Sequence, residues 1–347
     1  MNTTLSSRNR IISLDIIRGF ALLGILFINI PGYQVMEEGI TNTTNYSGID
    51  EVVNILISIF ITKKFFSIFS FLFGIGFYIF TSRVEARGDN PRKRFIRRLL
   101  SLLLIGIFHV FIFWGTILPA YACIGFLLLP FYNANLSTIS KWLSGISFVY
   151  LVAILVEFFI PEQPILSLIS ADSTLIFIMF LAGFGVAKAK WIENVGKMKK
   201  QIQQIQLITL PLFIGGSFWI WIASHSNNEQ LELIISLSSI PTVIFYLSTM
   251  FVLLENKQAV NLFTPVASVG RMALTNYVAQ SLIATVIMSF MNIEVVTPTQ
   301  TVWIAILIFM LQIIYTSIWF KFFKMGPLEK LWRFMTYGKR KTKQIQG

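Results

Sequence analysis

The sequence predicts an all-α, polytopic integral membrane protein with about ten transmembrane helices and with both the N- and C-termini in the cytoplasm. Three observations support this prediction: little charge, long apolar stretches, and basic residues gathered in alternate loops. Of the 347 residues, 55% are hydrophobic and only 13% are charged, whereas soluble domains carry roughly 25% charged residues. Most of the chain is therefore expected to contact a lipid bilayer.

The apolar stretches are predicted to be helices. A bilayer core takes about 20 apolar residues per helix, and backbone groups inside lipid must satisfy their own hydrogen bonds. Barrel strands would alternate with polar positions, which these stretches rich in Leu, Ile and Phe do not. The predicted spans are 11–32, 65–82, 96–115, 117–133, 142–160, 173–188, 204–223, 231–254, 272–291 and 301–323. The third and fourth are expected to form one hairpin, because only a tight turn near Gly115 separates them.

Charge predicts the orientation of the chain, because short loops rich in Lys and Arg stay in the cytoplasm. With the N-terminus inside, all 28 basic residues lie in or beside inner segments except Arg18, Lys63 and Lys64. Many acidic residues, among them Glu37 and Glu232, fall at or near the outer side. The net charge of +12 thus follows the topology, and nucleic acid is not an expected partner.

Residues 1–347 are expected to form a single membrane domain, because no loop is long enough to bury a core of its own. Segment 50–62 is too short to span and is predicted to be a helix on the outer surface. Segment 326–347 is predicted to be an amphipathic, basic tail on the inner leaflet, since Leu328, Leu331, Trp332 and Met335 form an apolar stripe. A solvated basic tail is the alternative.

The sequence excludes several kinds of active site. Cys123 is the only cysteine, so no internal disulfide and no cysteine-based metal cluster are expected. There is no phosphate-binding loop, no HExxH motif and no serine nucleophile elbow, and no metal site is evident. No cleavable signal peptide is expected, because Asp15 and Arg18 interrupt the first apolar stretch.

Polar residues inside a membrane are costly, and they usually face a cavity or one another. Asp15 and Arg18 are three residues apart on the first helix. Asn29 follows eleven residues after Arg18, so all three share one face, about 16 Å long from Arg18 to Asn29. They are predicted to line a polar cavity that crosses much of the membrane. Asp15 and Arg18 are predicted to pair, since an unpaired charge here would be costly. In the alternative to the cavity, this pair only locks helix packing and Asn29 lies near the outer headgroups.

His109 is the candidate catalytic residue, because imidazole gains and loses a proton near neutral pH. It lies past the middle of the third span, and Arg98 lies eleven residues before it on the same face. Packing of His109 against a neighbouring helix is the alternative. The other histidine, His225, is expected to be solvated in an outer loop.

Two further features concern contacts between helices. Asn276 and Gln280 are four residues apart in the ninth span and face one direction. They are candidates for cavity lining, with adhesion between helices as the alternative. Segments 71–76 and 180–185 form a faint internal repeat with paired glycines, which predicts close packing between helices.

Five separated blocks of the chain resemble the YeiB-like bacterial membrane proteins, a family catalogued as domain of unknown function 418. The blocks occur in the family's order and reach from the first helix to the tail. They are 14–25 closing at Asn29, 65–77, 97–122 with His109, 270–281, and 326–333. The resemblance implies a multi-pass protein of the bacterial plasma membrane, and an older label for the family implies transport.

The first-helix motif is also similar to that of membrane acyltransferases of the heparan-alpha-glucosaminide N-acetyltransferase type. This similarity implies transfer of an acyl group from cytoplasmic acyl-CoA, as co-substrate, to an acceptor across the membrane. Asn29 matches an asparagine of that group, whereas the 33–50 loop lacks the histidine that the group uses for catalysis. In the YeiB-like pattern an Asp often follows Trp-Gly, where this chain has Thr116.

Three functions therefore stay open. In acyl transfer, acyl-CoA would lie near Arg18 and Arg98, and His109 would be a general base or transient acyl carrier. In transport, a small solute would cross the membrane through the same polar cavity, with His109 as a proton relay. In the third, the protein is a non-catalytic membrane component with packed polar residues. The bilayer and a small-molecule substrate are the expected partners, and the sequence specifies no oligomeric state.

We expect reporter fusions at Arg87, Lys199 and Gly347 to report a cytoplasmic location, and a fusion at Asn227 to report an outer one. The reason is that basic loops are retained in the cytoplasm. Paired alkaline phosphatase and fluorescent protein fusions measure the two locations. An outer location at Gly347 would contradict the even number of spans.

Overall fold

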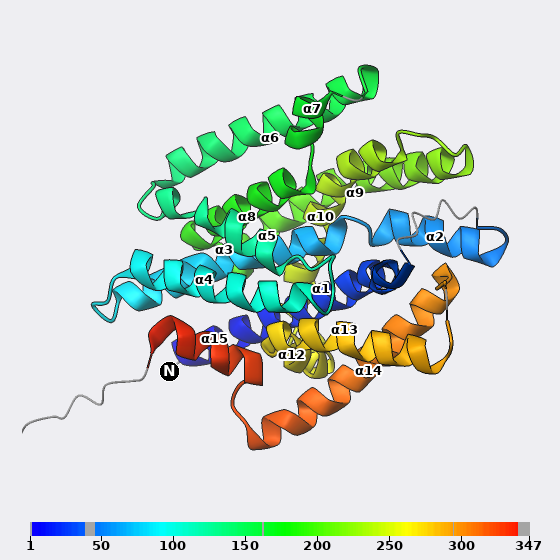
Figure 1. Cartoon of the computed structure of the whole chain (residues 1–347). Coiled ribbons are helices and arrows are strands. Elements are labelled where there is room, and N and C mark those ends of the chain that lie inside the picture. Colours follow the sequence, from blue (N-terminus) through cyan, green and yellow to red (C-terminus); the bar gives the residue numbers. More distant parts are fainter. Residues whose placement is uncertain (1, 39–45, 162, 294, 339–347) are drawn as a thin grey trace, which may run out of the picture.

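The computed structural model describes residues 2–38, 46–161, 163–293 and 295–338. Within these ranges every regular element is helical, which confirms the predicted all-α class (Figure 1). The elements are α1 (Asn2–Glu38), α2 (Ile49–Phe60), α3 (Lys64–Glu85), α4 (Pro91–Val110), α5 (Leu118–Phe126), η1 (Leu129–Phe131), α6 (Leu136–Phe159), α7 (Pro164–Ile169), α8 (Asp172–Lys188), α9 (Val195–His225), α10 (Leu231–Leu253), α11 (Lys257–Leu262), α12 (Thr264–Arg271), α13 (Ala273–Phe290), α14 (Pro298–Phe322) and α15 (Pro327–Tyr337).

The long helices form one bundle with two distinct ends (Figure 1). The start of α4 and the whole of α15 lie at one end, beside the start of α1, and we call this the tail end. The helix α2, the junction of α9 and α10, and the start of α14 lie at the opposite, far end. In the predicted topology the tail end is cytoplasmic, and this orientation stays a prediction.

Eight helical segments among the described residues are long and apolar enough to cross a bilayer, so the chain is a multi-pass membrane protein. The two other predicted spans correspond to α4 and α5. The helix α4 opens with five basic residues in the stretch PRKRFIRR, and α5 has only 9 residues. Nine residues rise about 14 Å, which is less than half of a hydrocarbon core of about 30 Å. The expected ten spans are therefore eight long helices and one shorter hairpin.

This hairpin of α4 and α5 packs closely along its length. A Cβ atom placed on Gly106 would lie 2.9 Å from the ring of Pro119, and one placed on Gly125 would lie 2.6 Å from Leu99. The pairing of early with late positions shows that the two helices run antiparallel, as predicted. Pro130 lies in the 3₁₀ turn η1 that follows α5, and because Pro has no N–H group it limits α-helical extension there.

The second apolar segment consists of α2 and α3, with a break at Lys63. The backbone of Lys63 is left-handed, with φ of 65°. Its ammonium group pairs with Asp172 at 2.9 Å and with Glu232 at 3.1 Å, which ties together the starts of α3, α8 and α10. The short helix expected before the second span is thus present as α2, and its place on the outer membrane surface stays a prediction.

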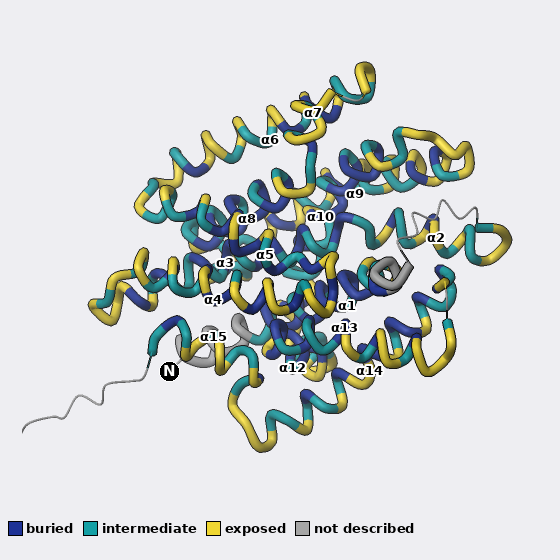
Figure 2. Tube along the Cα trace, viewed as in Figure 1, coloured by how far each residue is buried: buried dark blue, intermediate teal, exposed yellow. Residues whose placement is uncertain are grey.

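Side-chain exposure fits a bundle surrounded by lipid (Figure 2). Large apolar side chains remain exposed on α6 and α9, including Phe148 at 67%, Leu207 at 70% and Phe218 at 65%. Extended apolar surfaces of this kind are uncommon on proteins that face water. The exposed faces of α6 and α9 are therefore suited to acyl chains of a bilayer.

The two glycine segments that resemble each other in sequence pack against each other in space. A Cβ atom on Gly74 of α3 would lie 2.0 Å from the carbonyl oxygen of Phe180, and one on Gly183 of α8 would lie 1.9 Å from that of Phe71. The two contacts are reciprocal, because each Gly follows the contacted Phe of its own helix by three residues. Backbones approach this closely only where no side chain intervenes.

The helices α1 and α12 make a second contact of this kind. A Cβ atom on Gly270 would lie 1.9 Å from the carbonyl oxygen of Asp15, and one on Gly19 would lie 2.4 Å from that of Val266.

The short helices α11 and α12 were not expected from the sequence, because the apolar pattern around them is weak.

The C-terminal helix α15 is fixed to α4 through its last turn. Arg94 and Arg97 of α4 donate hydrogen bonds to carbonyl groups that the end of α15 would otherwise leave unpaired. The acceptors are the carbonyls of Met335, Thr336 and Tyr337, at 3.0 to 3.3 Å. A further hydrogen bond from Arg94 holds the pKa of the Asp89 carboxyl below its usual value.

The first turn of α15 is fixed to α13. The Glu329 carboxylate accepts from the backbone N–H groups of Leu274 at 2.8 Å and Thr275 at 3.1 Å, so it caps the N-terminus of α13. Of the predicted apolar stripe, Leu328 and Trp332 pack on the core while Leu331 is exposed. Contact of this helix with the inner leaflet stays a prediction, and residues 339–347 of the predicted tail lie outside the described residues.

We expect Gly74→Ala to destabilise the protein by about 1–3 kcal/mol, the usual cost of overpacking a core. The added methyl group would meet a backbone carbonyl that cannot move unless α3 and α8 separate. Thermal unfolding of the detergent-purified protein measures the change. Gly76→Ala is the matched control, because a Cβ atom there has no heavy atom within 4 Å. Equal melting temperatures for the two variants would contradict the close contact.

Candidate functional site

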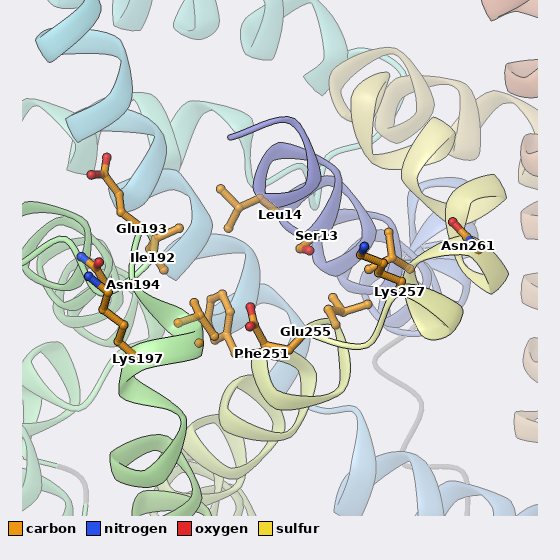
Figure 3. Close-up of a pocket in the computed structure, with 14 residues that line it drawn as sticks. Ser13, Leu14, Ile192, Glu193, Asn194, Lys197, Phe251, Glu255, Lys257 and Asn261 are labelled. Carbon is orange, nitrogen blue, oxygen red and sulfur yellow. The ribbon is translucent and has the colours of Figure 1, made fainter. Parts of the chain in front are cut away.

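Two cavities lie towards the tail end of the bundle. The larger, about 630 Å³, is bordered by α1, α9, α10 and α11 (Figure 3). Its wall carries two lysines and two glutamates, Lys197, Lys257, Glu193 and Glu255, so its charges balance. The candidate residues named from the sequence lie elsewhere.

The second cavity, about 490 Å³, is the candidate site because it contains both Arg18 and Arg98. Six arginines line it: Arg18, Arg83, Arg87, Arg98, Arg271 and Arg333. Among its described lining residues, Glu329 is the only carboxylate, and it already caps α13. Arginine presents a fork of donors that matches phosphate oxygens. We call the part of the cavity lined by these arginines the arginine mouth. It is therefore suited to an anion with several charged oxygens.

Beyond the arginines the walls of this cavity become apolar. Leu22 of α1 and Leu102 of α4 lie there together with aromatic side chains of α3. The lining residues include the buried Tyr121 and Tyr277. The Tyr121 hydroxyl is 2.7 Å from the Ser70 hydroxyl. A ligand with an anionic head and an apolar chain would match this cavity, which is lined by arginines at one end and by apolar side chains beyond them.

His109 lies behind Tyr277, with the two ring centres 5.4 Å apart. It is 2% exposed. Its Nδ1 atom is 2.8 Å from the hydroxyl of Thr116, and its Nε2 atom is 2.7 Å from the hydroxyl of Ser281. Tyr277 lines the cavity, whereas His109 and Ser281 are not among its lining residues. The tautomer of His109 decides which hydroxyl donates to it and which accepts.

Asn29 extends this polar cluster towards the far end. Its amide lies beside the hydroxyls of Tyr33 and Tyr277. The Tyr277 hydroxyl accepts from the backbone N–H of Ile117 at 3.1 Å. In the part of the chain that the structure describes, Asn29 Nδ2 and the Tyr33 hydroxyl are buried without a hydrogen-bond partner. Asn29 therefore belongs to the cluster around His109 and not to the arginine mouth.

The pairing of Asp15 with Arg18 is confirmed. Arg18 Nη1 lies 2.6 Å from Asp15 Oδ1, and 28% of the Arg18 side chain is exposed. Arg271 is a second cation near Asp15. Arg18 also lines the cavity while Asp15 does not, so the carboxylate orients a guanidinium at the mouth.

Arg98 is held at the cavity by the tail helix. Its guanidinium lies 3.6 Å from the ring centre of Trp332 and 5.0 Å from that of Phe80. The Trp332 indole N–H donates to the Arg98 carbonyl at 2.8 Å. The stacked guanidinium keeps its orientation, since a cation is attracted to the face of an indole ring.

Asn276 and Gln280 face α12 and α14 and not the cavity. Asn276 donates to the Val269 carbonyl at 2.8 Å, and Gln280 donates to the Gln312 side chain at 2.9 Å. Tyr315 donates to Asn276. Both amides are fully buried. Their observed contacts are those of adhesion between helices, the alternative that the sequence left open.

Sequence reasoning placed three residues of this site outside any functional role. Ser281 and Tyr277 lie on α13 one turn apart, and Trp332 lies on α15. The spacing of Tyr277 and Ser281 by four residues could have indicated a shared face. Nothing in the sequence indicated that this face meets His109, because 172 residues separate Ser281 from His109.

Comparison with known proteins identifies the family. The profile of DUF418, described as a protein of unknown function, matches residues 186–339. An uncharacterized 39.9 kDa protein in the amylase 3' region of Bacillus acidopullulyticus is 31% identical over 349 residues, which cover 95% of each chain. The chain belongs to the DUF418 family.

More distant relatives of this DUF418 protein also align over nearly the full length. YxaH of Bacillus subtilis (strain 168) is 28% identical, with 95% of each chain covered. YeiB of Escherichia coli (strain K12) is 26% identical, with 94% of this chain and 96% of YeiB covered. The resemblance to YeiB-like proteins is thereby confirmed, whereas acyltransferase similarity stays a prediction. No solved protein structure matches the chain.

We expect Asp15→Asn and Arg18→Gln to destabilise this DUF418 protein more singly than together. Each single change leaves one charge without its partner, whereas the double change removes both charges. Because Arg18 is partly exposed, the single cost should lie between the ~0–1 kcal/mol of a surface pair and the ~3–5 kcal/mol of breaking a buried one. Thermal unfolding of the four proteins gives the coupling. Additive effects would contradict the pairing.

Proposed function

We propose that this protein is an acyltransferase of the bacterial plasma membrane. It takes an acyl group from cytoplasmic acyl-CoA at the arginine mouth and passes it to an acceptor on the other side of the Tyr277 ring. The observation that supports this proposal is one continuous cavity. It joins six arginines to an apolar passage that reaches Tyr277, whose ring lies 5.4 Å from His109.

The mouth supplies what the head of acyl-CoA requires. Phosphate groups carry several acceptor oxygens, and arginine forks bind them in pairs. Arg83 and Arg87 are exposed, and Arg18 and Arg98 are partly buried, so positive charge continues inward. The apolar walls beyond would hold the pantetheine arm and acyl chain, since apolar surface is removed from water there.

His109 would be the general base of the reaction. An acceptor hydroxyl or amine loses a proton to an imidazole nitrogen while its oxygen or nitrogen attacks the thioester carbonyl carbon. The new C–O or C–N bond forms, the C–S bond breaks, and the thiolate leaves with a proton. A neutral imidazole in a buried site is suited to this transfer. Asn29 and Tyr277 would lie beside the reacting carbonyl.

Transport of a small solute is the second candidate. The observation that favours it is the larger cavity beside α1, whose lysines and glutamates suit a polar solute of low net charge. In that case CoA thioesters should not bind. Glu255→Gln, which changes a carboxylate of that cavity, should then slow or uncouple solute flux.

We expect acetyl-CoA to bind the purified protein, and Arg18→Ala or Arg98→Ala to raise its Kd at least about ten-fold. Loss of a charge-assisted hydrogen bond costs about 1.5–3 kcal/mol, and 1.4 kcal/mol is a factor of ten. Calorimetric titration in detergent measures binding. Lys197→Ala is the matched control, because it removes a cation from the other cavity.

His109→Ala is expected to slow acyl transfer by about 10²–10⁴ while leaving acetyl-CoA binding within two-fold of the unchanged protein. Release of free CoA thiol, followed with a thiol reagent, measures the rate. A variant with near-full transfer would remove His109 from the mechanism. Equal weakening by Lys197→Ala and Arg98→Ala would contradict the assignment of the donor to the arginine cavity.

A further inference from the structure

We infer that Ser281 is the acyl acceptor on the protein itself, and that it forms a covalent acyl-serine intermediate with His109 as its base. This inference rests on the proposed acyltransferase function. It adds a two-stage reaction in which the donor leaves before the final acceptor reacts. The sequence contains no serine nucleophile elbow, so only the fold brings this pair together.

The geometry carries the inference. The Ser281 hydroxyl lies 2.7 Å from His109 Nε2, and the Thr116 hydroxyl lies 2.8 Å from Nδ1. The imidazole thus lies between a nucleophile and a third polar group that orients it, which is the arrangement of nucleophilic serine catalysis. All three residues are buried, so water is kept from an ester formed there. The Ser281 hydroxyl also lies 2.9 Å from the Val278 carbonyl, an alternative acceptor for its proton.

Thr116 stands where serine hydrolases have a carboxylate. A threonine hydroxyl can accept a hydrogen bond from Nδ1–H and so leave Nε2 free to take the Ser281 proton. It cannot stabilise the imidazolium by charge as an aspartate does. Thr116→Asp is therefore expected to accelerate acylation of Ser281, provided that the variant folds.

Two polar groups of α1 belong to the cluster around Tyr277 and lack a hydrogen-bond partner among the described residues. Asn29 Nδ2 is buried without an acceptor in the described part of the chain, and so is the Tyr33 hydroxyl. Asn29 lies beside Tyr277, which is one turn before Ser281 on the same helix. Buried donors without partners are costly, and they are found where a reaction supplies the missing charge. We assign Asn29 Nδ2 to the carbonyl oxygen of the tetrahedral intermediate.

Access to Ser281 requires movement of Tyr277. The Tyr277 side chain lines the cavity and its ring centre lies 5.4 Å from that of His109, whereas the His109–Ser281 pair does not line the cavity. Rotation of this ring breaks the hydrogen bond from the Ile117 N–H at 3.1 Å and connects the passage to Ser281. Tyr277 is therefore a positioning residue that admits the acyl group.

The two stages balance. In the first, Ser281 Oγ bonds to the thioester carbonyl carbon, its proton moves to His109 Nε2, the C–S bond breaks, and the thiolate takes that proton as free thiol. In the second, an acceptor hydroxyl or amine attacks the ester carbonyl and gives its proton to His109. The C–Oγ bond then breaks, and Oγ regains the proton.

The test is to mix the full-length protein with acetyl-CoA, without any acceptor, and to follow thiol release and protein mass. We expect a burst of one thiol per chain, and an acetyl group on the peptide that contains Ser281. Ser281→Ala should lose the burst and the label while acetyl-CoA binding stays within two-fold. Ser289→Ala, an exposed serine on the same helix, is the matched control and should keep both.

Ser281→Cys is a second variant in case Ser281→Ala is poorly folded, and it should form a thioester that hydroxylamine cleaves. Thiol release by Ser281→Ala equal to that of the unchanged protein would overturn the inference and leave acyl transfer standing. An acetyl group on His109 in place of Ser281 would do the same. If the unchanged protein binds acetyl-CoA but neither releases thiol nor is labelled, the inference is overturned, whereas direct transfer to an acceptor stands. Failure of the unchanged protein to bind acetyl-CoA would overturn both.

Discussion

The contact between α1 and α12 is the constraint on which the arginine site depends. A Cβ atom on Gly270 would lie 1.9 Å from the Asp15 carbonyl oxygen, so the two backbones touch where Asp15 pairs with Arg18. This contact brings Arg271, the last residue of α12, to the same mouth. It also sets the start of α13, which follows α12 directly. With any side chain at this point, α13 would lie further from α1 and from Asn29.

The helix α13 carries polar side chains on two different faces, and the two sets have different partners. Asn276 and Gln280 lie on one face and make fully buried hydrogen bonds towards α12 and α14. Tyr277 and Ser281 follow them by one residue each, about 100° further around the helix, and lie beside His109. The first pair has partners that fix the helix in place. The second pair meets a titratable ring and a cavity, and for that reason we assign chemistry to it.

The tail helix α15 connects structural support with ligand recognition. Its first turn caps α13 through Glu329, and its last turn accepts hydrogen bonds from arginines of α4. Between these two attachments, Trp332 stacks on Arg98 at 3.6 Å. Loss of the helix would therefore free the arginine mouth and the start of α13 together. The site is built from elements near both ends of the sequence, which a long bundle brings into contact.

The sequence by itself determined the all-α membrane class, the α4–α5 hairpin and the Asp15–Arg18 pair, because hydropathy, turn residues and helical spacing are local properties. It also named His109 and Arg98, since a polar side chain in an apolar helix is visible in one dimension. Only the tertiary structure decided that Ser281 and Thr116 flank His109, and that Asn276 and Gln280 bind helices instead of lining the cavity. Which face of a helix meets which neighbour depends on backbone contacts such as Gly19 with Val266. Such contacts join residues hundreds of positions apart, and helical periodicity carries no information about them.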